Sequence, residues 1–305
     1  FFSDTETSTG NTFTAGALDL KVDSEAHYNG SICLPLIDTD ENTPPYTWQG
    51  GNEYPVGLGC DGTWEETDLG INHQFFDLRD IKPGDEGENT ISLHVYNNDA
   101  WGRFVVNNVG DHDNDCTEPE TETSADPECD VATPGTDLST NGLGELAESI
   151  VFNAWLDQGA IPGFQNVDVD GNPVDADNET GGVQKPDPME GDNIQNPQLV
   201  EGTEQLFWIG ETVDEVSEGP FNLSNVLAAA YVQGACTDTD GSTGYGLCQG
   251  LAQDGRMVGS TTYYFGLGWS VPVTVSNEAQ TDSLVADLAF EVEQHRNNPL
   301  QFDGI

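Results

Sequence analysis

Residues 166–177, with the sequence NVDVDGNPVDAD, carry oxygen-bearing side chains at the spacing of a calcium-binding loop. The loop would turn at Gly171, and its expected ligands are Asn166, Asp168, Asp170 and Asp177. Ca²⁺ takes carboxylate and amide oxygens at alternating positions around such a glycine turn. The pattern therefore predicts a calcium site, although Asp stands where a bidentate Glu is usual and no flanking helices are expected.

Two shorter acidic stretches, DHDND at 111–115 and TDTDGS at 237–242, repeat this alternation more weakly. For all three stretches the alternative is a solvated acidic loop, because acidic residues are abundant in every loop of the chain. Calcium is accordingly the one ligand that the sequence suggests, and we expect no cofactor to be required.

The five histidines do not form a recognisable catalytic motif. A zinc protease usually carries two His one helical turn apart in the pattern H-E-x-x-H, which is absent here. The G-x-S-x-G motif, the P-loop and the dinucleotide-binding fingerprint are absent too. His94 lies on the strand face opposite Leu93, which predicts a position at the surface or at a sheet edge. The sequence therefore favours a protein that is not an enzyme.

Six cysteines, an even number without zinc-type spacing, favour disulfides in an oxidising extracellular compartment. Pairing of nearest neighbours would join Cys33 to Cys60, Cys116 to Cys129 and Cys236 to Cys248. It is one of several possible connectivities, and it would close three short loops, each worth about 3 kcal/mol. The chain also carries three N-x-S/T sequons as candidate glycosylation sites, at Asn29, Asn178 and Asn222.

The charge balance is extreme, because 55 Asp and Glu stand against 7 Lys and Arg, giving a net charge of −48. Charged residues are still only 20% of the chain and hydrophobic residues are 35%, so a core can form. Molar salt shortens the Debye length to about 3 Å and screens the repulsion between carboxylates. The composition thus predicts a halophilic protein of archaeal origin, the alternative being an acidic extracellular protein from moderate salt. So negative a chain disfavours nucleic acid and anionic membranes as partners.

Export from the cell is the next expectation. No stretch approaches the roughly 20 apolar residues of a membrane-spanning helix, so we expect no membrane span. The chain begins at Phe1 without a basic, apolar targeting segment, and we therefore expect that a signal peptide has been removed. Together with the cysteines, this predicts an extracellular location.

The elements that must position these residues are mainly strands. Apolar and polar alternation between turn residues predicts strands at 29–37, 73–80, 90–97, 101–108, 149–157, 261–275 and 284–292. We expect the strands 73–80, 90–97 and 101–108 to form an antiparallel meander. Short helices are expected at 142–149 and 224–231.

Long acidic loops rich in Gly, Asn and Pro separate these segments, at 38–70, 109–141, 158–200 and 234–256. The stretches 109–141 and 158–200 are expected to be surface excursions, because plain connections in compact domains are much shorter. With neither a linker nor an internal repeat, residues 11–305 are expected to form a single all-β domain, a β-sandwich with acidic loop insertions.

Several stretches resemble the TasA/camelysin family of secreted, fibre-forming proteins. The opening FFSDTETSTGNTFTAGALDLKV (1–22) resembles the mature N-terminus of that family, whose members often begin with an aromatic pair and SDTETS. DIKPGDEGENTISLHVYNNDAW (80–101) is similar to the family's Pro-Gly turn and the strand after it. ELAESIVFNAWLD (145–157), YYFGLGWSVPV (263–273) and QTDSLVADLAFEVEQHRNN (280–298) resemble the archaeal members, including the bundling pili. The acidic loops between these stretches match nothing in the family.

The resemblance implies a jelly-roll β-sandwich whose N-terminal segment, residues 1–10, completes the sheet of the next subunit as a donor strand. The donor residues would be Phe1, Phe2, Ser3, Asp4, Thr5, Glu6, Thr7, Ser8 and Thr9. This segment lacks proline and is rich in Thr and Ser, which suits an extended strand whose backbone N–H groups can all pair. The alternatives are a frayed terminus or a strand that pairs within its own subunit.

The function implied is that of an extracellular filament subunit, in a pilus or a biofilm matrix, that supports cohesion between cells or with surfaces. Its partners would be identical subunits joined head to tail and, where filaments bundle, neighbouring filaments. Strands near 90–97 or 284–294 are the candidate acceptors. One alternative is a camelysin-type metalloprotease, disfavoured by the missing His pair. Another is a monomeric calcium-dependent adhesion or carbohydrate-binding module.

Overall fold

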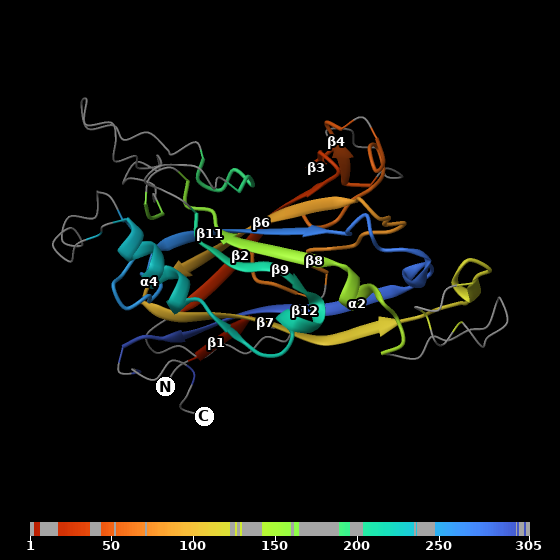
Figure 1. Cartoon of the computed structure of the whole chain (residues 1–305). Coiled ribbons are helices and arrows are strands. Elements are labelled where there is room, and N and C mark those ends of the chain that lie inside the picture. The colour runs from red at the N-terminus through yellow and green to blue at the C-terminus, as the bar shows by residue number, and fades with distance from the viewer. Residues whose placement is uncertain are drawn as a thin grey trace.

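In the computed structural model, antiparallel β-sheets form two layers that lie face to face (Figure 1). The all-β class predicted from the sequence is confirmed, because strands dominate the described part of the chain and its helices are short. The structure describes residues 3–6, 18–36, 44–51, 53–70, 72–122, 126, 129, 142–159, 162–164, 189–195, 204–234, 236, 248–296, 298 and 302.

The smaller sheet contains the first and the last strand of the chain. Its order is β1–β12–β7–β10, with bounds β1 (Ser3–Glu6), β12 (Ser283–Gln294), β7 (Ala100–His112) and β10 (Phe221–Asn222). Each pairing in it is antiparallel. The strand nearest the N-terminus thus lies at one edge of this sheet.

The larger sheet has the order β4–β3–β2–β6–β11–β8–β9, and β5 pairs with β2 beside this path. Its pairings are antiparallel as well. The bounds are β2 (Asp19–Tyr28), β3 (Ser31–Pro35), β4 (Tyr46–Gln49), β5 (Trp64–Thr67), β6 (Glu86–Tyr96), β8 (Val151–Leu156), β9 (Leu206–Thr212) and β11 (Thr261–Ser270).

Helices are few and short among the described residues. They are α2 (Leu146–Ser149), α3 (Val213–Val216) and α4 (Ser224–Gln233), with 3₁₀ turns at Glu120–Glu122 and Asn277–Ala279. The helices expected at 142–149 and 224–231 correspond to α2 and α4. None of the described helices is long and apolar enough to cross a membrane.

The main core lies between the two sheets and is rich in aromatic rings. Phe104 of β7 packs edge-on against Phe265 of β11, with ring centroids 5.0 Å apart, and against Phe290 of β12 at 4.8 Å. A second cluster at one end contains Tyr28, Trp48 and the Cys33–Cys60 disulfide. Because side chains from both sheets interdigitate, the layers are held together by apolar burial.

Strand alternation predicted several strands correctly. Ile91, Leu93 and Val95 in β6 are each 1% exposed, as the period of two requires of one face. β12 likewise contains the predicted segment 284–292, with Phe290 and Val292 buried. The strands predicted at 29–37, 149–157 and 261–275 appear as β3, β8 and β11 with shorter bounds.

The predicted meander is wrong. Residues 73–80 form no strand, and β6 and β7 belong to different sheets. The Phe75 ring packs against Trp64 and Phe290, with ring centroids 4.9 Å and 5.7 Å apart. Phe75 is therefore part of the core although it lies in an irregular segment. Its carbonyl oxygen accepts a hydrogen bond from the Asn89 side chain at 3.1 Å in place of a ladder partner. The chain reverses at 97–99, and both long strands bury their apolar faces by entering opposite layers.

Sequence patterns missed β2, which is ten residues long and lies next to β6 in the larger sheet. Its buried face includes Ser24, 3% exposed, among Leu20, Val22 and Ala26. This polar residue breaks the apolar alternation, and its hydroxyl oxygen accepts a hydrogen bond from the Asn89 side chain at 3.3 Å. A local pattern cannot show that a serine is satisfied by a residue 65 positions away.

Candidate functional sites

The first candidate site is the edge at which the N-terminal strand meets the last strand. β1 pairs with β12 in the register Ser3 with Glu293, Asp4 with Val292, Thr5 with Glu291 and Glu6 with Phe290. On its other side β12 pairs with β7 along its whole length (Figure 1). Phe1, Phe2, Thr7, Ser8 and Thr9 lie outside the described residues. β1 is therefore an edge strand added to a sheet that the rest of the chain builds.

The two candidate acceptor strands have different surroundings. The strand at 284–294 belongs to β12, the partner of β1. The strand at 90–97 belongs to β6, which is enclosed between β2 and β11 and has no edge to offer. Proposing 90–97 as an acceptor was therefore wrong. The edge that β1 joins lies on β12, and Phe290 and Val292 anchor this strand in the core behind it.

The six cysteines form three disulfides, Cys33–Cys60, Cys116–Cys129 and Cys236–Cys248. These are the nearest-neighbour pairs along the chain. Disulfides form and persist in oxidising environments and are rare in the cytosol. They indicate a secreted or extracellular protein.

The second candidate site is a cluster of three carboxylates, Asp113, Glu120 and Asp282, hereafter the carboxylate cluster. One oxygen from each lies within 4.8 Å of the others, close enough for one cation to contact all three. Asp113 is 1% exposed and Glu120 is fully buried. Hard cations such as Ca²⁺ favour such oxygen ligands.

Local hydrogen bonds hold the cluster in place. The Thr281 hydroxyl donates to Glu120 Oε1 at 3.1 Å, and the backbone N–H of Thr117 donates to Glu120 Oε2. The backbone N–H of Glu145 donates to Asp282 Oδ2 at 2.6 Å. Within DHDND, only Asp113 belongs to this cluster, since Asp111 accepts a hydrogen bond from Ala147 N–H instead.

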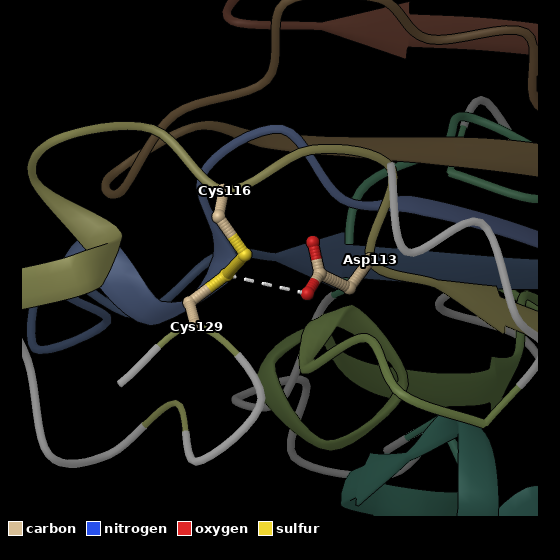
Figure 2. A group of neighbouring side chains, drawn as sticks. All are labelled: Asp113, Cys116 and Cys129. Carbon is tan, nitrogen blue, oxygen red and sulfur yellow. Dashed lines mark hydrogen bonds between the residues drawn. A yellow bond between two sulfur atoms is a disulfide. The ribbon is translucent and has the colours of Figure 1, made fainter. Parts of the chain in front are cut away.

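A disulfide lies against the cluster. Figure 2 shows Asp113 Oδ2 pointing towards Cys129 Sγ, 3.5 Å away, with Cys129 bonded to Cys116. A sulfur in a disulfide carries no proton to donate and no thiolate charge with which to bind a metal. Asp113, Cys116 and Cys129 are thus neighbours without being a metal centre, and any cation here would bind the carboxylates.

Burial and mutual repulsion change the ionisation of the cluster. Burial raises the pKa of Asp282 to about 7, and repulsion from Asp111, Asp113 and Glu120 adds to the effect. Burial likewise raises the pKa of Asp111 above its ordinary value. A carboxyl whose pKa is raised in the folded state binds a proton more tightly than in the unfolded chain. Between the ordinary value of 3.8 and about 7, rising pH therefore lowers stability.

We expect Asp282→Asn to remove this pH dependence. Without divalent cations, the variant should melt at a higher temperature than the wild type at about pH 8 and at a similar temperature at about pH 4, because the neutral amide abolishes the repulsion. Thermal unfolding at the two pH values, at the same molar salt concentration and with a chelator present, measures both melting temperatures. Asp287→Asn, at an exposed carboxylate of β12, is the matched control and should change neither melting temperature. An equal shift at both pH values would contradict the prediction.

A polar row crosses the outer face of the larger sheet. His94 Nε2 lies 2.6 Å from Asp23 Oδ2, and His94 Nδ1 lies 3.0 Å from Thr262 Oγ1. These are the residue types of a nucleophile, a base and an orienting acid. They project from three paired strands whose backbone N–H groups belong to the ladder, so no backbone donor there can form an oxyanion hole. The arrangement favours a structural role. His94 lies on the outer face of the sheet and is partly buried, but β6 is enclosed between β2 and β11, so the edge position offered for it was wrong.

Some of the residues predicted to bind calcium or to carry glycans lie among the described residues, and others do not. The calcium-type loop (Asn166, Asp168, Asp170 and Asp177), the sequon residue Asn178 and the stretch 237–242 lie outside the described residues. Asn29 occupies the turn after β2, where its side-chain nitrogen donates to Asp85 Oδ1 at 2.9 Å. Asn222 lies in β10, opposite Arg103. Glycosylation at the three sequons stays a prediction.

Comparison with known proteins adds no assignment. No protein-family model matches the chain, and no curated protein matches it.

Proposed function

We propose that this protein is a secreted filament subunit that polymerises head to tail by donor-strand complementation, as a pilus or biofilm-matrix fibre at the cell surface. The observation that carries the proposal is the position of β1, an edge strand whose ladder partner is β12 alone among the described strands. An edge of this kind is where a strand from another chain can add to a sheet.

Exchange between subunits costs no ladder bond. β1 belongs to the smaller sheet, whereas the next strand, β2, belongs to the larger one, and residues 7–17 are the covalent link between 3–6 and the described residues that follow. A neighbour's β1 placed on β12 in the same register forms the same hydrogen bonds as the chain's own β1. Exchange of an identical element is a low-cost route to assembly, and a head-to-tail exchange that does not close makes an open filament.

Other features support the same setting. The three disulfides fit a subunit that folds outside the cell. The net charge of −48 fits a protein of concentrated brine. Two antiparallel sheets around one core are compatible with a jelly roll, and we include the jelly roll and membership of the TasA/camelysin family in the proposal.

The two alternative functions receive less support. Neither group of metal-ligand side chains found among the described residues includes a histidine, which is the usual zinc ligand of a metalloprotease. A calcium-dependent adhesion module would need a cation on the carboxylate cluster or on the 166–177 loop, and it would leave the edge position of β1 without a role.

Disulfide trapping across the β1–β12 pair tests the proposal. Thr5 and Glu291 lie opposite each other, and directly opposed positions of an antiparallel pair are about 4.5–5.5 Å apart at Cα, within reach of a disulfide. All six native cysteines are already bonded. We expect Thr5→Cys subunits reassembled with Glu291→Cys subunits to form covalent dimers under mild oxidation.

The controls separate exchange from self-pairing. Val273, 79% exposed, provides a matched position, and Thr5→Cys mixed with Val273→Cys should give no dimer. The double variant Thr5→Cys/Glu291→Cys should give a ladder of covalent oligomers. If it instead closes within single chains, and the mixed single variants stay monomeric, β1 belongs to its own subunit and the proposal fails.

A further inference from the structure

A cavity of about 350 Å³ lies beside β4, which contributes Trp48 to its lining. β3 and β4 lie on the side of the molecule away from β1 (Figure 1). Tyr28, Trp48 and Tyr54 contribute aromatic rings to the lining of the cavity, together with Pro55 and Leu58. Asp61, Asp77 and Arg79 contribute charged groups. Ligand pockets share this make-up, in which an aromatic wall is joined by a few polar groups.

The loop that forms one wall is held rigidly. The Cys33–Cys60 disulfide ties its end to β3. Trp48 N–H donates to Leu58 O at 3.0 Å, Gly57 N–H donates to Trp48 O at 2.8 Å, and Cys60 N–H donates to Tyr46 O at 3.2 Å. A wall fixed before binding loses little conformational entropy when a ligand arrives.

The same loop exposes apolar surface without a described partner to cover it. Tyr54 and Leu58, which both line the cavity, are 39% and 49% exposed. The Tyr54 ring is nevertheless fixed, because its hydroxyl donates to Arg79 O at 2.6 Å and its ring packs edge-on against Tyr28 at 6.0 Å. Exposed apolar side chains that are surrounded by polar residues are typical of a surface that binds a ligand or another protein.

The charges around the cavity narrow the class of ligand. Lys82 Nζ already lies 5.5 Å from the centre of the Tyr54 ring, so a cationic ligand at that ring would meet a like charge. Asp61 and Asp77 would repel an anion, as would the chain's net charge of −48. Arg79 and Asp77, joined by an ion pair at 3.2 Å, offer a hydrogen-bond donor beside an acceptor. A neutral ligand with one apolar face and several hydroxyl groups fits these constraints.

We propose that the cavity binds a neutral pyranose sugar of an extracellular glycan. The apolar face of the sugar ring would pack on Tyr54 and Leu58, and its hydroxyls would bond to the Asp61, Asp77 and Arg79 side chains. This site does not rest on filament assembly, because it is built from the end of β2, from β4 and from the loop residues 54–61 and 77–79. The protein would thereby hold a glycan, whether on another copy of this chain or on another molecule.

Saturation-transfer NMR in molar salt tests the site, with the methyl pyranosides of glucose, galactose, mannose and N-acetylglucosamine as probes. We expect at least one to receive saturation from the wild-type protein. Tyr54→Ala should weaken that binding by about tenfold, whereas Tyr54→Phe, which keeps the ring, should retain it. Val56→Ala, on the same loop but outside the lining, is the matched control and should bind as the wild type does.

Two results would overturn the proposal. One is that no pyranoside receives saturation, or that Tyr54→Ala binds as well as the wild type while its circular dichroism shows an intact fold. The other is that tetramethylammonium binds at Tyr54 and no pyranoside does, which would make the cavity an aromatic site for cations. To distinguish the two sources of glycan, the titration is repeated with the oligosaccharide released from the protein itself. Binding of that oligosaccharide points to contacts between copies, and binding of the methyl pyranosides alone points to a foreign glycan.

Discussion

Removal of residues 1–10 is expected to abolish filaments while the remaining chain stays folded. β1 contributes one edge pairing, opposite Phe290–Glu293 of β12, whereas the two core clusters are built from residues 20 onwards in the described chain. The deletion therefore removes the strand that is proposed to join subunits and leaves the apolar core that stabilises the domain. Electron microscopy in molar salt reads out filaments, and thermal unfolding of the same samples confirms the fold.

Mixing the truncated chain with the full-length chain makes the prediction sharper. A truncated subunit keeps the β12 edge but has no strand to donate, so it should end a growing filament at one side. Mean filament length should then fall as the truncated fraction rises. A protein of unrelated sequence at the same concentration is the control and should leave the length unchanged. Filaments of normal length from the truncated chain alone would show that assembly uses another surface.

A single methyl group added at Gly266 in β11 is expected to destabilise the domain strongly. Trp155 of β8, 2% exposed, lies across this glycine, and a Cβ at 266 would stand 1.9 Å from Trp155 Cε2. The indole must therefore leave its place. We expect Gly266→Ala to lower the free energy of unfolding by about 1–3 kcal/mol, the range seen when extra atoms are forced into a packed core.

Gly268, two residues along the same strand, is the matched control. A Cβ there would stand 3.4 Å from Trp155 Cζ3, an ordinary contact, so Gly268→Ala should change stability by less than about 0.5 kcal/mol. Urea denaturation of both variants in one molar-salt buffer, followed by tryptophan fluorescence, measures the difference. Equal effects at the two positions would mean that strand propensity, and not the indole, limits the substitution.

Alternation of side chains found the strands whose apolar face is unbroken. In β6, β8, β11 and β12 alternate apolar side chains enter the core, as Ile91, Leu93 and Val95 of β6 do, and this period of two is visible in the sequence. β2 was missed because Ser24 interrupts its buried face. The meander was wrong because alternation does not say which sheet a strand joins, and β6 and β7 enter opposite layers. Layer assignment depends on partners distant in sequence.

The candidate sites likewise include features that the sequence predicts and features that depend on contacts between distant residues. The disulfide partners lie 27, 13 and 12 residues apart, and such short loops made the nearest-neighbour pairing the natural expectation. The carboxylate cluster joins Asp113 and Glu120 to Asp282, and no spacing rule connects residues so far apart. The cavity beside β4 likewise combines Tyr28 with residues between 48 and 79. The sequence shows the aromatic residues of the cavity, but it does not show that they lie together.

Composition and local pattern alone determined the acidic character, the all-β class and the strands with an uninterrupted apolar face, because these depend on each residue and its near neighbours. The tertiary structure alone decided that the first strand pairs with the last, that 90–97 is enclosed while 284–294 meets β1, and that three distant carboxylates lie together. Each of these is a contact between segments far apart along the chain. Such contacts form only when the rest of the chain has brought both segments to the same place, and neither segment carries that information by itself.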